Sequence, residues 1–551
     1  MGNHIISFLA FLFFHILLLT HFGLANCATF CTQTPYPELC SSLISTSTTN
    51  QPTLDGNNDD QNYLSHLRSM SLRATLIQAE KSHELISQMD LTSFNDLAKS
   101  AWTDCVELYE DTIHHLSRSV NYENNPLDAQ TWLSAAIANE QACQNGFLDF
   151  NLSSHLQSFP YTLSDFSKFL SNSLAINKAM GISSSHTAQL HTTKNNKNRR
   201  LLIAHEVLQN DRVSFPGWVS PGDRKLLQSS GARTKLADMV VAQDGSGNYR
   251  TISEALAAAA KQRSGTKRFV IYVKKGIYKE NVEVKRSMKN LMFIGDGIDA
   301  TIVTGNKNVQ DGSTTFRSAT LAVTGNGFIA RGMTFENTAG PRKRQAVALR
   351  SSSDFSVFYQ CSFKGYQDTL YVHSQRQFYR DCDIYGTVDF IFGDAVTVIQ
   401  NSNIYIRKPM SNQKNTVTAQ GRKDPNENTG IIIHNSRVTG AAPAGPINFN
   451  YKSYLGRPWK KYSRTVFMKC TIDGLIDPAG WLPWSGDFGL STLYYGEYMN
   501  TGSGASTSGR VKWPGFHVIT NAAVARKFSV GNFLAGDSWI PSAGVPFTSG
   551  L

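Results

Sequence analysis

The sequence lacks the features that mark several common classes of hydrolase. It contains no Gly-x-Ser-x-Gly segment, which argues against a serine nucleophile elbow. Its histidines His373, His434 and His517 have no metal-ligand spacing, which argues against a histidine-bound metal centre. Charged residues make up only 17% of the chain and aromatic residues 11%, so extended disorder is excluded for most of it.

Long apolar runs are also missing after the first 20 residues. The run Ile5–Phe14 continues through Ile16–Leu19 and is followed by small residues near Ala25. This pattern predicts a secretory signal peptide over residues 1–26 and no membrane segment after its removal. A signal anchor is the alternative, but the run is short for a membrane span and is broken by His15.

Acidic residues are scarce in the second part of the chain. Residues 1–227 hold 14 basic and 20 acidic side chains, whereas residues 228–551 hold 39 and 22. The basic excess favours an anionic partner, either a nucleic acid or an acidic polysaccharide. A basic surface that is merely solvated is the simpler interpretation.

Residues 27–181 carry four helical patterns with short connections, which predict an all-α four-helix bundle. Cys31 and Cys40 bracket a short loop, while Cys105 and Cys143 lie on neighbouring predicted helices. These positions favour the disulfides Cys31–Cys40 and Cys105–Cys143, although four cysteines allow three pairings. Asn151 begins the sequon Asn-Leu-Ser, which predicts a glycosylation site. The residues with helical spacing on the four patterns are Leu64, Leu67, Ala74 and Ile77; Leu97, Ala101, Cys105, Leu108 and Leu116; Trp132, Leu133, Ala136, Ile137 and Glu140, led by Pro126; and Phe166, Phe169, Leu170, Ser173, Leu174 and Asn177.

Residues 182–234 change to a polar composition that predicts a linker. Two basic pairs, Arg199-Arg200 and Arg224-Lys225, each precede Leu-Leu. The repetition of this pattern predicts proteolytic processing at one or both sites. The alternative is a linker that happens to be basic.

From residue 235 onward, short strands follow one another with an internal repeat. Met333, Cys361, Cys382, Ser402, Ser436 and Cys470 fall in one column when the strands are aligned. Successive members are 28, 21, 20, 34 and 34 residues apart. Such spacing predicts an all-β parallel β-helix whose longer steps are loops.

The repeat brings two acids together. Asp368 follows Cys361 by seven residues, and Asp389 follows Cys382 by seven. Equivalent positions on neighbouring coils would place the two carboxyl groups roughly 5 Å apart, the spacing between strands. Two carboxyl groups so close cannot both ionise easily, so one is expected to act as an acid and the other as a base or nucleophile.

Around these acids the sequence resembles the plant pectin methylesterases. The resemblance rests on three blocks, Gly365–Tyr371, Tyr385–Gly393 and Leu455–Trp459, and on the two ends of residues 235–551. Residues 28–180 resemble the inhibitor-like pro-region of the same family, and the two dibasic Leu-Leu segments resemble its processing sites. This resemblance implies a right-handed parallel β-helix esterase domain preceded by a four-helix-bundle domain.

The resemblance also implies the roles of individual residues, with neither a metal nor an organic cofactor. Asp389 matches the nucleophile, and Asp368 matches the proton donor and acceptor. The remaining implied residues are Gln345 and Gln367 as oxyanion donors, Arg457 as the partner of the nucleophile and a substrate contact, and Thr315, Gln345 and Trp459 as substrate contacts.

The implied substrate is methylesterified homogalacturonan in the cell wall. A proteinaceous pectinesterase inhibitor and a subtilisin-like processing protease are the implied protein partners, and a monomer without nucleic acid is expected. Two positions depart from the family pattern: Ser402 replaces a cysteine, leaving Cys382 to pair with Cys361 or remain a thiol, and Asp394 replaces an asparagine. The rival interpretations are a polygalacturonase-like glycosidase and a helical domain that inhibits a partner enzyme.

Overall fold

The computed structural model describes residues 30–45, 59–121, 126–157, 159, 162–192, 237–262, 266–441 and 451–551. The predicted signal peptide, Cys27 and both dibasic sites lie outside these ranges. The chain forms two compact units. The first comprises Met1–Met89, Tyr109–Ile137 and Phe159–Ile203, and the second comprises Asp90–Leu108, Ala138–Ser158 and Ala204–Leu551.

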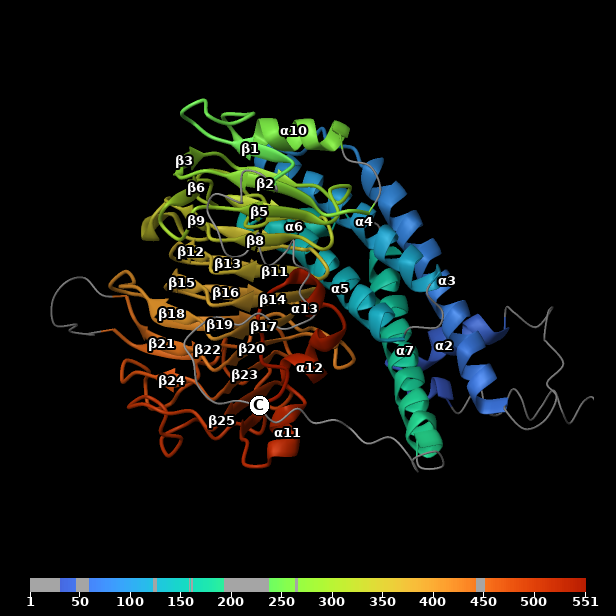
Figure 1. The fold of residues 1–551 in the computed structure, drawn as a ribbon. Helices are drawn as coiled ribbons and strands as arrows, with labels where there is room; N and C mark the ends of the chain where they lie inside the picture. The colour runs from blue at the N-terminus through green and yellow to red at the C-terminus, as the bar shows by residue number, and fades with distance from the viewer. Residues whose placement is uncertain are drawn as a thin grey trace, which may run out of the picture. The chain divides into compact units, whose positions relative to one another are not determined.

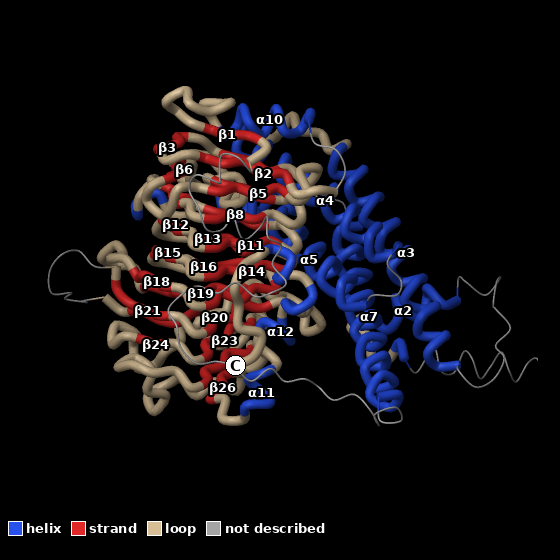
Figure 2. The backbone as a smooth tube through the Cα atoms, in the orientation of Figure 1, coloured by secondary structure: helices blue, strands red, loops and turns tan. Residues whose placement is uncertain are grey.

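Helices make up the described N-terminal part, as the periodicity predicts (Figure 2). The last long helix continues to Thr192 and so extends into the range expected for the linker. The helices are α2 (Pro37–Ser45), α3 (Asp59–Ser87), α4 (Asp96–Asn121), α5 (Pro126–Asp149), α6 (Ser153–Leu156) and α7 (Thr162–Thr192).

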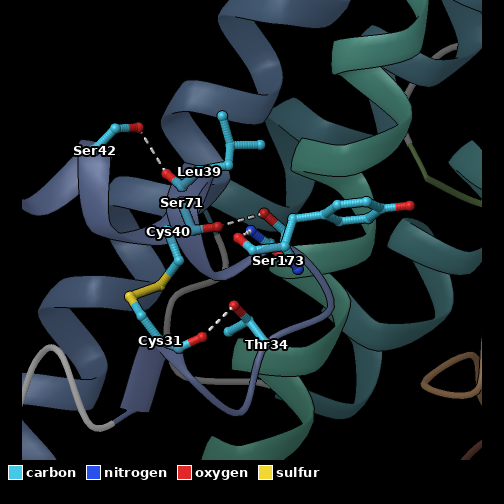
Figure 3. The surroundings of a disulfide bond; sticks show 9 residues. Cys31, Thr34, Leu39, Cys40, Ser42, Ser71 and Ser173 are labelled. Atoms are coloured by element: carbon cyan, nitrogen blue, oxygen red, sulfur yellow. Dashed lines mark hydrogen bonds between the residues drawn. A yellow bond between two sulfur atoms is a disulfide. The ribbon is translucent and has the colours of Figure 1, made fainter.

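Both disulfides favoured by the sequence are present. One disulfide joins Cys31, which precedes α2, to Cys40, which lies in α2 (Figure 3). In the loop between them, the Thr34 hydroxyl donates to the Cys31 carbonyl at 2.7 Å. Cys105 and Cys143 join α4 to α5. Each bridge lies within a single unit, and it therefore restricts the unfolded chain locally.

The apolar faces of the helices are confirmed in part. Ile77 is 62% exposed and Leu97 is 37% exposed, so the prediction that they face a core is wrong. Part of the buried face of α3 is polar instead, because the hydroxyl of Ser173 on α7 pairs with Ser71 at 2.6 Å (Figure 3) and with Thr75 at 2.8 Å. The sequence prediction included Ser173 on its helical face but neither Ser71 nor Thr75, which lie on the facing helix.

The second unit contains three parallel sheets that together form a β-helix (Figures 1 and 2). Sheet A has β1 (Met239–Val241), β2 (Phe269–Val273), β5 (Leu291–Ile294), β8 (Ile329–Arg331), β11 (Ser356–Tyr359), β14 (Arg376–Arg380), β17 (Val396–Gln400), β20 (Gly430–His434), β23 (Arg464–Met468), β25 (Tyr494–Tyr498) and β26 (Phe516–Val518). Sheet B has β3 (Gly276–Lys279), β6 (Thr301–Gly305), β9 (Thr334–Asn337), β12 (Ser362–Lys364), β15 (Asp383–Gly386), β18 (Asn403–Ile406), β21 (Arg437–Gly440) and β24 (Thr471–Ile472). Sheet C has β4 (Val282–Val284), β7 (Leu321–Val323), β10 (Leu349–Ser351), β13 (Leu370–Val372), β16 (Ile391–Gly393), β19 (Asn415–Gln420) and β22 (Ser453–Gly456).

The strand registers confirm the repeat column read from the sequence. In sheet A the partners are 28, 21, 20, 34 and 34 residues apart from β8 to β23. The residue before each of the six column members has a positive φ, which allows the chain to turn sharply from sheet A to sheet B. These residues are Gly332, Gln360, Asp381, Asn401, Asn435 and Lys469.

Apolar side chains fill the coil and also cover one of its outer faces. Leu349, Leu370 and Ile391 belong to the interior core, in which one coil packs on the next. Outside sheet A, Phe378 and Ile432 pack with Trp539 in the C-terminal tail. The tail's helices, α11 (Ala522–Arg526), α12 (Val530–Phe533) and α13 (Ile540–Ala543), and the helix α10 (Ile252–Gln262) complete the unit. Within the described ranges, no helix combines the length and the apolar character needed to span a bilayer.

Candidate active site

The register of sheet C places the two acids side by side. Leu370 of β13 pairs with Ile391 of β16, so Asp368 and Asp389, each two residues earlier, occupy equivalent positions. Both acids have left-handed backbones, with φ values of 62° and 51°. Strained conformations of this kind are typical of functional positions that the surrounding fold holds in place.

Asp389 is held on both of its oxygens. The Arg457 guanidinium donates from Nε to Oδ1 at 2.8 Å and from Nη2 to Oδ2 at 2.6 Å. The Thr416 hydroxyl donates to Oδ1 at 2.6 Å and accepts the backbone N–H of Asp389 at 2.9 Å. Such a two-pronged pair fixes the orientation of the carboxyl group.

Asp368 has the opposite electrostatic surroundings. Burial raises the pKa of its carboxyl well above the ordinary value, and the charges of Asp389 and Asp149 raise it further. Arg457 opposes this shift but donates its guanidinium hydrogens to Asp389. Asp368 therefore holds a proton at pH values at which an exposed aspartate has lost it.

All seven substrate and catalytic residues predicted from the sequence line one cavity. Its volume is about 400 Å³, and one wall is formed by residues of the 138–158 segment, which belongs to the same unit. The predicted residues on its walls are Thr315, Gln345, Gln367, Asp368, Asp389, Arg457 and Trp459.

Aromatic rings form a continuous part of the cavity wall. Tyr371 stacks on Phe392 with their ring centres 4.3 Å apart, and Phe392 meets Trp459 edge-on at 5.9 Å. Arg457 lies over the Trp484 ring at 4.4 Å, which ties this ring to the carboxylate pair. Apolar flat rings beside polar groups suit the faces of a sugar.

Gly421 lies beneath Trp459 and leaves room for its ring. A Cβ atom at this position would stand 2.9 Å from the ring carbon Cε3 of Trp459 and 3.4 Å from the carbonyl oxygen of Gly393. The Trp459 ring can therefore keep its present position only if residue 421 has no side chain.

Sequence reasoning missed Thr416, Phe316, Tyr371, Phe392 and Trp484. The register of β16 with β19 makes Thr416 the next member of the column of Asp368 and Asp389. The sequence spacing does not reveal this position, because Thr416 follows Ser402 by 14 residues instead of seven. The sequence also gives no signal for Trp484, which lies in a loop outside the repeat.

Two further acidic residues, Asp149 and Asp394, lie near the site. Asp149 accepts the backbone N–H of Thr315 at 2.8 Å, and burial raises the pKa of Asp149 to about 6. Asp394 accepts from Gln420 at 2.9 Å and from Thr429 at 2.5 Å, and burial raises the pKa of Asp394 as well. Burial and the charge of Asp394 together raise the pKa of Glu427, so Asp394 belongs to a separate acid cluster.

Two further sequence predictions concern residues of this unit, namely the cysteines Cys361 and Cys382 and the sequon at Asn151. Cys361 and Cys382 are buried free thiols, so the alternative in which they pair is wrong. Asn151, of the predicted sequon, is exposed at the wall of the cavity, and its glycosylation stays a prediction. Among the residues that the structure describes, no group of three His, Cys, Asp or Glu side chains is arranged to hold a metal ion.

Two family models match the chain. The model named Pectinesterase matches residues 238–537, which is more than half of the chain. The model named Plant invertase/pectin methylesterase inhibitor matches residues 25–176.

Individual relatives match over nearly the whole length. A protein described as probable pectinesterase/pectinesterase inhibitor 6 from Arabidopsis thaliana is 53% identical over 98% of this chain and 96% of its own length. Pectinesterase 2 from Citrus sinensis is 50% identical over 95% of this chain and 94% of its own. Among solved structures, the pectin methylesterase from carrot is 57% identical with a TM-score of 0.56, covering 57% of this chain and 98% of the carrot chain.

Proposed function

Because the chain belongs to the pectinesterase family and is a carboxylic ester hydrolase, we propose that it hydrolyses galacturonate methyl esters in pectin with Asp389 as nucleophile. The observation that carries this proposal is the unequal environment of the two acids. Arg457 binds both oxygens of Asp389, whereas burial raises the pKa of Asp368. One acid is thus prepared to attack and the other to donate a proton.

The reaction has two steps. An Asp389 oxygen bonds to the ester carbonyl carbon, and the resulting tetrahedral intermediate expels the methoxy group, which takes the Asp368 proton and leaves as methanol. The product of this step is an anhydride between Asp389 and the galacturonate. Asp368, now ionised, removes a proton from water as the water attacks the anhydride, and free galacturonate, Asp389 and protonated Asp368 result.

Gln345 and Gln367 would stabilise the charge that develops on the ester oxygen. Both line the cavity beside the two acids, and their amide N–H groups are neutral donors. Neutral donors add little to substrate binding but bind an oxyanion strongly, and one such donor contributes about 3 kcal/mol in comparable enzymes. Thr315 and Trp459 would contact the sugar chain.

The N-terminal region would keep the enzyme inactive until a protease cuts the linker. Asp149 lines the same cavity as the two catalytic acids, where a pectin chain would have to lie. We further propose that the chain is secreted to the cell wall and processed by a subtilisin-like protease at one of the dibasic sites. The match to the carrot enzyme covers 98% of the carrot chain but only 57% of this chain. The β-helix is therefore expected to fold without the residues before 228.

The products of the reaction test the chemistry. The part from residue 228 onward should release methanol from methylated pectin and form no new reducing ends, because the ester bond breaks and the glycosidic bond does not. Methanol and reducing ends are to be measured in the same reaction. Reducing ends without methanol would replace the esterase by the polygalacturonase-like alternative.

Replacing Gly421 with alanine should weaken substrate binding. The added methyl group must displace the Trp459 ring, because its ideal position is only 2.9 Å from that ring. We expect KM for pectin to rise roughly three- to tenfold, a loss of about 0.6–1.4 kcal/mol. Gly550→Ala is the matched control, since nothing lies within 4 Å of a Cβ atom there. Equal KM values for the two variants would contradict the proposal that Trp459 contacts the substrate.

A further inference from the structure

A buried histidine follows sheet C beside the catalytic cavity. The registers of β10 with β13 and of β13 with β16 place Ser352, His373 and Asp394 in one column, each directly after its strand. The backbone N–H of Asp394 donates to the His373 carbonyl at 3.1 Å, and the backbone N–H of His373 donates to the Ser351 carbonyl at 3.0 Å. His373 is only 1% exposed. Its position is therefore fixed by the coils on either side.

The surroundings of the imidazole ring decide which of its nitrogens carries the hydrogen. Nδ1 lies 2.9 Å from the Ser352 hydroxyl oxygen, which also accepts from Nη1 of Arg350 at 3.2 Å. Because a guanidinium cannot accept, the Ser352 hydroxyl donates its own hydrogen to Nδ1. Burial and the charge of Arg350 lower the pKa of His373 to about 3, so the ring is neutral. A neutral ring that accepts at Nδ1 carries its hydrogen on Nε2.

The Nε2–H group of His373 lacks a ligand in the intact chain. Among the described residues, none forms a hydrogen bond with this buried nitrogen, and the Ala138 carbonyl only opposes the fall in the pKa of the ring. The ring borders a cavity of about 10 Å³ in which Nε2 of Gln141 is a second buried donor that lacks an acceptor. Leaving a buried donor unsatisfied costs free energy, which points to a ligand that arrives later. The cavity is lined by Ala138 and Gln141 of α5 and by Tyr371, His373, Asp394 and Trp459.

We infer that, in the processed enzyme, Nε2–H of His373 binds a hydroxyl oxygen of the pectin chain beside the Trp459 ring. The inference rests on the proposed function, because release of the cut N-terminal region takes α5 away from the imidazole. Tyr371 and Trp459 line both this cavity and the catalytic one, so the two spaces adjoin and become one groove when α5 leaves. A sugar chain that lies on these two rings then passes the imidazole.

A hydroxyl suits this group better than a carboxylate does. The imidazole is a neutral donor, and the guanidinium of Arg350 lies behind Ser352, whereas the acid Asp394 lines the space itself. A carboxylate ligand would therefore lie against another acid, which is unfavourable. The ring hydroxyls of galacturonate are present with or without the methyl ester. Binding at His373 should thus depend little on the degree of esterification.

Three variants of the full chain, cut in the linker, test the inference. His373→Leu removes the donor, so KM for methylated pectin should rise roughly three- to tenfold with kcat unchanged, as expected for one neutral hydrogen bond far from the acids. The same rise is expected with half de-esterified pectin. His373→Gln has an N–H group near the place of Nε2 and should restore most of the affinity.

The matched control is His434→Leu, for which KM should equal that of the wild type. His434 is also a buried histidine, 2% exposed, and burial lowers its pKa to about 4. It lies at the end of β20 in sheet A, outside the catalytic cavity. The control therefore reports what the loss of a buried imidazole does to the fold alone.

Nitrogen NMR of the cut chain tests the tautomer independently of activity. His373 is identified by the signals that disappear in His373→Gln, and its Nδ1 should be unprotonated and its Nε2 protonated. Ser352→Ala removes the donor to Nδ1 and should shift the ring toward the other tautomer. A hydrogen on Nδ1 in the wild type would contradict the assignment of Nε2 as the donor.

The outcomes separate the two proposals. Absence of methanol release by the cut wild-type chain would overturn the proposed function. Methanol release by the wild type with the same KM for His373→Leu would overturn the inference about His373 alone. An equal rise for His434→Leu would also overturn it, because lost packing would then explain the effect. A rise confined to half de-esterified pectin would exclude the hydroxyl as ligand, since that substrate alone has many free carboxylates.

Discussion

Asp389→Asn should lower kcat for methanol release by about 10⁴-fold, because the amide cannot attack the ester. The substitution keeps the size and shape of the side chain. An amide oxygen in the place of Oδ1 can still accept from Thr416 and from Nε of Arg457, whereas the amide nitrogen faces Nη2 and the ion pair is lost. Substrate binding should therefore change little, and the loss should appear in kcat instead of KM. The measurement is the initial rate of methanol release at several pectin concentrations, with the part from residue 228 onward.

A second aspartate–arginine pair provides a matched control. Asp354 is fully buried, and its oxygens accept from Nε and Nη2 of Arg376, each at 2.8 Å. Asp354→Asn breaks a buried pair of the same geometry outside the cavity, so it should cost about 3 kcal/mol of stability. Its kcat at 25 °C should stay near that of the wild type. A rate for Asp389→Asn as high as that of Asp354→Asn would remove Asp389 as nucleophile.

The intact chain should be roughly 10²- to 10³-fold less active than the chain cut in the linker. A tethered inhibitor acts at an effective concentration in the millimolar range, so even a micromolar intrinsic affinity leaves only about one molecule in a thousand open. The carboxylate contacts in the second unit supply attraction, among them Asp104 with Arg317 at 2.6 Å and Glu140 with Lys423 at 3.5 Å. Methanol release before and after cutting measures the ratio. Equal rates would end the proposal of self-inhibition.

The inhibition should weaken as the pH rises. The pKa of Asp149 is about 6 in its buried place, whereas an exposed aspartate has a value near 3.8. The buried state therefore binds the proton more tightly than the released state, and it loses stability as pH rises from 3.8 through 6. The ratio of cut to intact activity should accordingly fall between pH 5 and pH 7. Asp149→Asn cannot ionise, so its ratio should vary less with pH, and an identical pH profile would contradict this role of Asp149.

The length of the β-helix coil and the pairing of the two acids can be predicted from the sequence alone. The spacings of 21 and 20 residues around Cys361 and Cys382 state how long each coil is, and the strand registers agree with them. Each coil repeats the same turn and the same pattern of side chains that point into the core. The length of a coil can therefore be read from the sequence of that coil alone. For the same reason, the sequence alone predicts that Asp368 and Asp389 lie side by side.

The other groups around these acids could not be predicted, because they come together only when distant segments fold against one another. Trp484 approaches the cavity from a loop and Asp149 from the end of α5, and the repeat relates neither of them to the acids. Thr416 lies on β19, but a longer loop before this strand separates it from its coil's column member Ser402. The same limit explains why Ile77, which lies on an apolar stripe, is exposed, while Ser71 and Thr75 are buried in hydroxyl pairs. Periodicity reports which residues of one element face the same way, but the partner of that face, and hence the charge and polarity it meets, depends on segments far away in the chain.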